Sequence, residues 1–133
     1  MEEVIRRLKE NQFGFLATVD NGKPRVRPFG FMFEENGRLY FCTGSGKSVY
    51  KQLIDCPYVE YSLTARDMVT LRISGCIEFT EETDKKEKAL NSSSVVKSRY
   101  ATADNPVFKV FYIEHGTAVI TDFTGNPPRI IEF

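Results

Sequence analysis

Two Asn-Gly pairs, each next to an alternating apolar and polar run, constrain the fold of this chain more than any other feature. Asn21-Gly22 follows residues 13–20, and Asn36-Gly37 precedes residues 38–43. Asn-Gly favours the tight turn in which both central residues have positive φ, and this turn joins antiparallel strands. Residues 24–33 lie between the two turns, so the sequence predicts that they form a strand shared by two hairpins.

Further alternating runs extend this pattern to six or seven antiparallel strands. Residues 58–64 and 69–79 alternate, and residues 107–115 and 117–123 are predicted to form a last hairpin that turns at Gly116. A single small domain with this many strands must protect its sheet edges, as barrels and sandwiches do. The sequence therefore predicts a mainly β, antiparallel fold, with short helices over residues 2–10, 47–54, 80–90 and 95–100.

Composition limits the class of protein. The 133 residues suit a single domain spanning 1–133, and 41% hydrophobic with 27% charged residues is typical of a globular chain. Eighteen basic and eighteen acidic residues give zero formal charge, which argues against nucleic acid as a partner. The three cysteines lack metal-ligand spacing, so we expect neither a metal site nor disulfides. The first residues are charged and no apolar run reaches membrane length, so we expect a cytoplasmic protein without membrane contact.

The run TGSGKSVYK at residues 43–51 has the composition of a phosphate-binding turn. It leaves a predicted strand, passes two glycines and enters a helix near Lys47. The first backbone N–H groups of a helix lack intrahelical acceptors, and the helix dipole favours an anion there. Side-chain donors come from Thr43, Ser45, Lys47 and Ser48. An ordinary strand-to-helix turn with a solvated lysine fits the spacing equally well.

Gly46-Lys47-Ser48 also imitates the end of the phosphate-binding loop of nucleoside-triphosphate-binding proteins. That motif needs a glycine at position 41, where this chain has Phe41. No following βαβ unit supplies an aspartate for Mg²⁺, so we do not expect nucleoside-triphosphate hydrolysis.

Two arginines, Arg25 and Arg27, lie on one face of the predicted strand that contains Pro28. Guanidinium groups bind phosphate through paired hydrogen bonds. If Val26 points into the core and this strand pairs with residues 38–43, both arginines converge on the phosphate-binding turn. The alternative is a solvated strand face. Pro28 removes a backbone donor and predicts an edge or a bulge.

Arg72 and His115 have simpler explanations. Arg72 is expected to form an ion pair with Glu60. His115 is the one histidine of the chain and has no companion at catalytic or metal-ligand spacing, so we expect a solvated turn residue.

Taken in order, these segments resemble the pyridoxamine 5′-phosphate oxidase-like family of FMN-binding split barrels. The resemblance runs from the leading helix through GFLATVDNGKPRVRPFGFMF (14–33) and GRLYFCTGSGKSVYKQL (37–53) to Pro57-Tyr58-Val59-Glu60. The chain is similar to the small bacterial branch of nitroimidazole-resistance proteins. The resemblance implies an antiparallel split β-barrel, FMN as cofactor, and a homodimer with FMN at the subunit interface.

Carried onto this sequence, the FMN contacts of the family fall on two groups of residues. Those that would flank the flavin are Arg25, Val26, Arg27 and Pro28. Those that would hold the phosphate are Thr43, Ser45, Lys47 and Ser48.

The resemblance also implies a flavin-dependent oxidoreductase acting on a small molecule, either nitro-aromatic or like pyridoxamine phosphate. Pyridoxamine phosphate oxidases carry a tryptophan and an Arg-x-His motif after a segment like residues 130–133, and this sequence has neither, so pyridoxamine phosphate itself is the poorer candidate. A non-catalytic FMN carrier or sensor would have the same signature, and a cofactor-free binding barrel is a further alternative. In the wider fold, the alternative cofactors are a deazaflavin and haem, for which His115 is the sole histidine available. No side chain is predicted to be catalytic.

Overall fold

Both predicted Asn-Gly turns form, with the backbone geometry that this pair favours. In the computed structural model, which describes residues 1–133, Asn21 and Gly22 have φ of 53° and 78°. Asn36 and Gly37 have φ of 52° and 81°. Positive φ at both central residues gives the turn a twist that matches that of the flanking antiparallel strands.

The remaining elements alternate between strands and short helices. The helices are α1 (Glu2–Glu10), α2 (Ser48–Asp55), α3 (Thr83–Asn91) and α4 (Ser94–Tyr100). The strands are β1 (Phe13–Asp20), β2 (Lys23–Gly30), β3 (Phe33–Glu35), β4 (Arg38–Gly44), β5 (Tyr58–Thr64), β6 (Thr70–Thr80), β7 (Phe108–Thr121) and β8 (Arg129–Glu132). None of the helices combines the length and the apolar character that crossing a bilayer requires.

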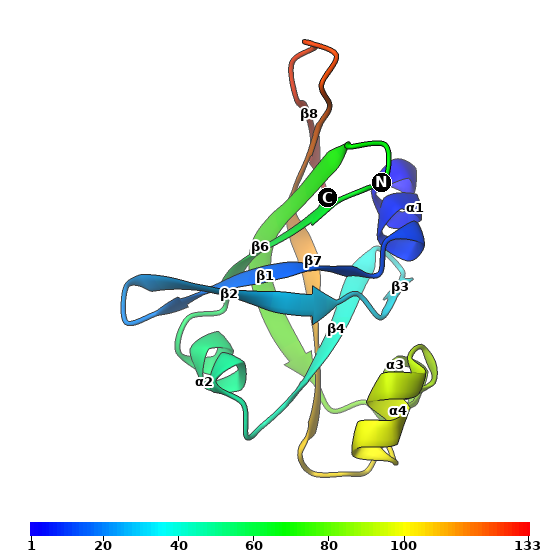
Figure 1. The fold of residues 1–133 in the computed structure, drawn as a ribbon. Coiled ribbons are helices and arrows are strands. Elements are labelled where there is room, and N and C mark those ends of the chain that lie inside the picture. Colours follow the sequence, from blue (N-terminus) through cyan, green and yellow to red (C-terminus); the bar gives the residue numbers. More distant parts are fainter.

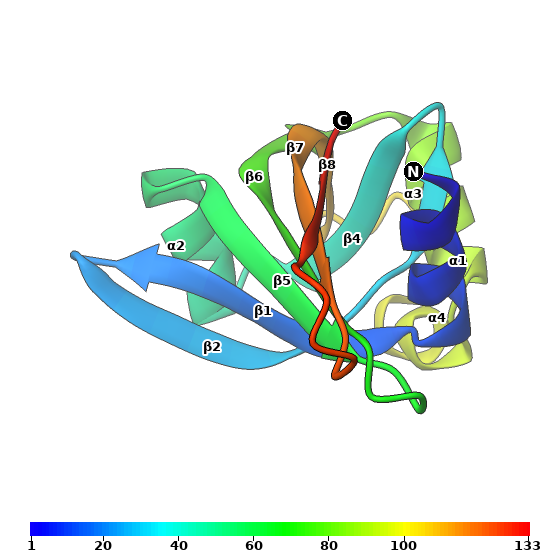
Figure 2. The ribbon, with the colours of Figure 1, turned by 90° about the horizontal axis from the view of Figure 1, so that it is seen from above.

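All eight strands belong to one antiparallel sheet that curls around a core without closing (Figure 1). The strand order is β2-β1-β5-β6-β7-β4-β3, and β8 pairs with the second half of β7. Seen from above, the β1–β2 hairpin reaches out at one end, while α1, α3 and α4 gather at the other (Figure 2). The mainly β, antiparallel split barrel that the sequence predicted is confirmed.

Gly116 does not turn the chain, so the hairpin predicted over residues 107–115 and 117–123 is wrong. β7 is one continuous strand that pairs with β6 on both sides of Gly116. A Cβ at Gly116 would lie 2.3 Å from the carbonyl oxygen of Ser74, so glycine is needed here for close approach of two strands. The prediction fails because close backbone approach selects glycine just as a turn does.

The strand predicted over residues 24–33 is interrupted, and its expected pairing with residues 38–43 holds only at its end, where Met32 and Phe33 meet Tyr40, and is wrong for the part that carries the two arginines. β2 pairs only with β1, and the short β3 makes the second hairpin with β4. The chain crosses between the two hairpins at one peptide step. The N–H of Phe31 donates to the Gln12 carbonyl at 2.7 Å, whereas the N–H of Met32 donates to the Tyr40 carbonyl at 3.0 Å.

The faces of β1 and β2 are reversed relative to the assumption that Val26 points inward. The register places Val26 opposite Ala17 and Arg27 opposite Leu16, and residues that face each other across a ladder share a side of the sheet. Leu16 is fully buried, which brings Arg27 to the inner side, while Val26 is 67% exposed.

The outer side of the same strands is apolar. We use the name outer apolar face for the exposed side chains that β1, β2 and β5 present there, which are Phe13, Phe15, Val26 and Tyr58. Exposed apolar patches of this kind mark interaction surfaces more often than scattered single residues do.

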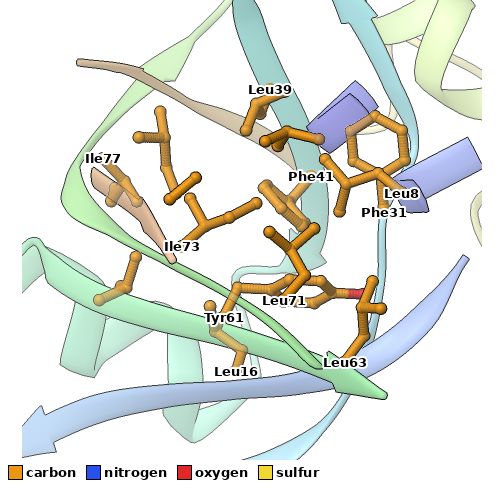
Figure 3. Packing of buried hydrophobic residues seen from close by; sticks show 14 of the residues in the cluster. Leu8, Leu16, Phe31, Leu39, Phe41, Tyr61, Leu63, Leu71, Ile73 and Ile77 are labelled. Carbon is orange, nitrogen blue, oxygen red and sulfur yellow. The ribbon is translucent and has the colours of Figure 1, made fainter. Parts of the chain in front are cut away.

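The main core fills the inner side of the sheet, with Phe41 of β4 at its centre (Figure 3). The Phe41 side chain is fully buried. Its ring lies between 5.1 and 6.3 Å, centroid to centroid, from four other rings, those of Phe29, Phe31, Tyr61 and Phe111. A second, smaller core lies where α3 and α4 pack against β4 and β7. The two cores flank β4, and the site described next lies between them.

Candidate functional site

A cavity of about 250 Å³ lies where the end of β2 approaches β4 and α4. Figure 1 shows β4 descending between α2 on one side and α3 with α4 on the other, so segments far apart in sequence meet here. The lining comes from the start of β1, the crossing from β2 to β3, the end of β4 and the α3–α4 segment. One residue of the turn into α2, Lys47, also lines it.

Aromatic rings form one side of the cavity. Phe29 and Phe31 both line it, and both pack their rings against Phe41 in the main core. Pro28 extends this wall from the edge strand β2. A wall of this kind is rigid and apolar, as small-molecule sites commonly are.

Thr43 carries the only buried side-chain oxygen in the protein without a hydrogen-bond partner. The residue lines the cavity and is 2% exposed. Native proteins pair nearly all such atoms, because a buried hydroxyl without a partner costs about 1–3 kcal/mol. The hydroxyl of Thr43 therefore has one hydrogen bond still to make, and it lies beside this cavity.

Replacing Thr43 with valine tests whether that hydroxyl serves a ligand. We expect the free energy of unfolding of the ligand-free protein to rise by about 1 kcal/mol, because no hydrogen bond is lost and a desolvated hydroxyl is removed. Thr18→Val is the matched control, since Thr18 is equally buried but hydrogen-bonded to Arg27 and Gln52, and it should lose about 1–3 kcal/mol. Urea unfolding of both variants measures the difference, and equal losses would contradict this explanation of Thr43.

Lys47 brings a free positive charge to the cavity at the start of α2. It is exposed, and it takes part in none of the ion pairs of the protein. The first turn of α2 has no side-chain cap and no acidic residue. Its backbone N–H groups and the dipole of the helix therefore add to the charge of Lys47 in attracting an anion.

Cys42 also lines the cavity but is not a reactive thiolate. Burial raises the pKa of its thiol to about 12, against the opposing effect of the nearby Lys47 charge. A thiol that stays neutral at physiological pH contributes packing rather than nucleophilic chemistry.

The opposite wall is formed by α4. Ser93 caps this helix by accepting a hydrogen bond of 3.3 Å from the N–H of Val96. Val95 is 72% exposed at the cavity rim, and Arg99 lies above the ring of Tyr100. The Tyr100 hydroxyl would lie 2.8 Å from a Cβ at Gly44, so Gly44 is the residue that lets α4 approach β4.

Arg27 is held beside the cavity rather than in its lining. Its guanidinium donates to the hydroxyl of Thr18 at 2.7 Å, to the side-chain oxygen of Gln52 at 2.6 Å and to the Leu16 carbonyl at 3.2 Å. Burial lowers the pKa of this guanidinium, which remains charged at any physiological pH. Arg27 shares its strand face with Phe29, two residues away, which does line the cavity.

Three of the residues predicted to bind a cofactor line the cavity, and the other five lie outside its lining. Pro28, Thr43 and Lys47 line one cavity. Arg25 forms an ion pair of 3.2 Å with Asp20 near the tip of the β1–β2 hairpin. Of the remaining four, Arg27 lies beside α2, Val26 belongs to the outer apolar face, Ser45 donates its N–H to the Val107 carbonyl, and Ser48 begins α2.

Sequence reasoning missed the residues that only the fold brings to the site. Phe29 and Phe31 were visible as an aromatic pair next to Pro28, but nothing in the local pattern separates a cavity wall from ordinary core. Gln52 lies in the second turn of α2, and the α4 wall lies more than forty positions from Thr43 along the chain. No local signal marks any of them.

His115 and Arg72 lie outside the cavity. His115 is exposed on β7 as expected, but in a strand rather than in a turn, and it does not line the cavity. The cavity therefore offers no histidine to a haem iron. Arg72 forms the predicted ion pair with Glu60, at 3.6 Å.

Comparison with known proteins agrees with this architecture. The sequence profile described as pyridoxamine 5′-phosphate oxidase matches residues 1–118. Among curated proteins, none matches this chain. The structure of a NimC/NimA family protein from Clostridium acetobutylicum is 32% identical, with a TM-score of 0.90 over 100% of this chain and 92% of the other.

Two more distant structures share the fold and differ in the cofactor that they are described as binding. A heme binding protein from Mycobacterium smegmatis is 16% identical, with a TM-score of 0.80 over 99% of this chain and 56% of its own. A pyridoxamine 5′-phosphate oxidase-related, FMN binding protein from Nostoc punctiforme is also 16% identical, with a TM-score of 0.65 over 97% of this chain and 86% of its own. The profile match and the NimC/NimA likeness both span most of the sequence, and this chain belongs to the pyridoxamine 5′-phosphate oxidase family.

Proposed function

We propose that this protein binds FMN in the cavity between β2, β4 and α4 and acts as a flavin-dependent oxidoreductase on a small molecule. The observation that carries the proposal is the buried, unpaired hydroxyl of Thr43 next to the free charge of Lys47. A phosphate monoester supplies both the acceptor oxygen that the hydroxyl lacks and the negative charge that the lysine lacks.

The phosphate end of the ligand is assigned to the start of α2. Thr43 and Lys47 would hold it directly, and the uncapped first turn of α2 would add backbone N–H groups, with Ser45 and Ser48 as neighbouring hydroxyls. We assign Arg27 as the second cation for this end, because it lies on the inner face of β2 and its guanidinium donates to Gln52, one turn into α2. A deazaflavin cofactor also carries a phosphate, so this assignment of the phosphate end would suit it as well. Haem carries no phosphate and would not fit the assignment.

The ring end is assigned to the aromatic wall. Phe29 and Pro28, backed by the buried ring of Phe31, give an apolar wall for an isoalloxazine, and the edge strand β2 has backbone groups free to contact its polar rim. A relative described as an FMN binding protein has the same fold, which supports this choice of cofactor.

When bound, FMN supplies the hydride or electron transfer, and the side chains of this protein bind it and orient it. The Cys42 thiol stays neutral and the lining holds no histidine, and we assign no acid–base role to a side chain. The substrate is then either a nitro-aromatic electron acceptor, which reduced flavin reduces, or an electron donor similar to pyridoxamine phosphate, which oxidised flavin oxidises. A carrier or sensor that binds FMN without turnover is the alternative, and steady-state assays with NAD(P)H and nitro-aromatic acceptors separate the two.

The proposal includes a homodimer in which a second chain completes the site. A cavity of about 250 Å³ lies at the small end of the ~300–1,000 Å³ of typical ligand sites, which supports a site that a second chain enlarges. Phe13 lines the cavity and also belongs to the outer apolar face, which makes the two surfaces continuous. A second copy laid on that face would cover the exposed rings and close the cavity.

An absorbance spectrum of the purified protein, recorded before and after FMN is added and excess removed, tests the proposal. We expect retained bands near about 370 and 450 nm, which are properties of the flavin. Light scattering of the same sample should give twice the 15.2 kDa mass of one chain. A sharp Soret band would replace FMN with haem as the cofactor, and a colourless protein would leave a cofactor-free binding barrel.

A further inference from the structure

Thr18, Gln52 and Arg27 form a compact polar cluster between the β1–β2 hairpin and α2. The side-chain oxygen of Gln52 accepts from the Thr18 hydroxyl at 2.6 Å and from the Arg27 guanidinium at 2.6 Å. The Thr18 hydroxyl also accepts from Arg27 at 2.7 Å. Thr18 and Gln52 are 2% and 8% exposed. Each member contacts the other two, so the guanidinium is held in one orientation.

This cluster holds a positive charge without neutralising it. All three hydrogen bonds of Arg27 go to uncharged oxygens, and no carboxylate pairs with it. The acids that β1 and α2 carry are engaged elsewhere, Asp20 with Arg25 and Asp55 with Lys51. A half-buried guanidinium normally has a carboxylate partner, because an uncompensated charge away from water is costly.

We infer that Gln52 is a positioning residue that fixes Arg27 through a neutral acceptor, so that the charge of Arg27 remains available to the ligand phosphate. The inference rests on the proposed function, in which that phosphate lies at the start of α2. Gln52 does not touch the ligand, and it acts through the guanidinium that it orients.

The uncharged amide of Gln52 orients Arg27 without pairing with its charge. A glutamate at position 52 has the same shape and would accept the same two hydrogen bonds, because the structure gives the Gln52 amide nitrogen no bond to lose. It would differ in charge alone, forming an internal ion pair with Arg27. An internal carboxylate then competes with the phosphate for the same guanidinium.

Two substitutions at this position separate orientation from charge. Gln52→Glu keeps the hydrogen bonds and neutralises Arg27, whereas Gln52→Ala removes the hydrogen bonds and leaves the charge. Asn126→Asp is the matched control, an amide-to-carboxylate change on an exposed residue of the β7–β8 loop, far from α2. FMN affinity is measured by quenching of flavin fluorescence, and the unfolding temperature is measured with and without inorganic phosphate.

We expect Gln52→Glu to bind FMN about tenfold or more weakly and to lose most of the stabilisation that phosphate gives, while its ligand-free unfolding temperature is equal to or above that of the wild type. Gln52→Ala should bind a few-fold more weakly and unfold at a lower temperature, and Asn126→Asp should leave FMN affinity and the phosphate response unchanged. A role in folding alone cannot produce a variant that is at least as stable and yet binds more weakly.

Wild-type affinity in Gln52→Glu, or a fall in its unfolding temperature like that of Gln52→Ala, would overturn the inference. If the wild type itself retains no FMN, the proposed function fails. The phosphate titration is then the measurement that tests the positioning role of Gln52. In that case a phosphate response that Gln52→Glu retains overturns the inference, and one that it loses supports it.

Discussion

FMN binding by the Lys47→Ala variant is expected to be about 10- to 100-fold weaker than by the wild type, with the fold intact. A hydrogen bond between charged partners contributes about 1.5–3 kcal/mol, and each 1.4 kcal/mol is a factor of ten in affinity. Lys47 is exposed and makes no ion pair, so its removal leaves no partner unsatisfied in the ligand-free protein. Titration of flavin fluorescence measures the affinity, and thermal unfolding checks the fold.

Lys51→Ala provides the control on the same helix. Lys51 has the same charge, is 84% exposed, and forms only a surface pair of 3.6 Å with Asp55. Because it does not line the cavity, its loss should change FMN affinity by less than about twofold. Equal FMN affinity in Lys47→Ala and the wild type would remove the phosphate end of the ligand from the start of α2.

Phe41→Ala is expected to lower the free energy of unfolding by about 3–5 kcal/mol. The side chain is fully buried and contacts four rings, which come from the β2–β3 segment, β5 and β7. Its removal leaves a void that rings on rigid strands cannot fill by relaxation, so the cost includes the cavity as well as the lost transfer free energy. Urea unfolding followed by circular dichroism gives the difference.

Phe123→Ala is the matched comparison for Phe41. This ring is 81% exposed between β7 and β8, so the same change in chemistry should alter stability by less than about 0.5 kcal/mol. If Phe41→Ala cost no more than Phe123→Ala, the ring cluster would not be the centre of the core.

Much of the fold follows from local rules that act over a few residues. The Asn-Gly turns, the leading helix and the strand over residues 58–64 all form where the sequence places them. Each depends on backbone preference or on a short alternation of apolar and polar residues, and both are properties of residues close together in the chain. The ion pair of Arg72 with Glu60 follows in the same way from two adjacent strands.

The predictions that the structure contradicts share a different cause. Gly116 and the break after β2 both reflect contact with strands distant in sequence, in which a carbonyl or a hydrogen-bond partner from elsewhere determines the backbone. The direction of Val26 depends on the register with β1, where one step of the ladder exchanges the inner and outer faces. Which face of a strand is buried depends on the packing of the whole sheet, so the sequence of one strand does not determine it.

The sequence by itself determined the class of fold, the two Asn-Gly turns and the glycine-rich, hydroxyl-rich composition of the turn that contains Lys47. Only the tertiary structure decided which residues share the cavity, that Thr43 is buried without a partner, and that Arg27 is held by Gln52 rather than by an acid. The physical reason is that turn chemistry and alternation act between near neighbours. Burial, strand register and charge pairing, in contrast, depend on residues that are distant in sequence and come into contact only in the folded sheet.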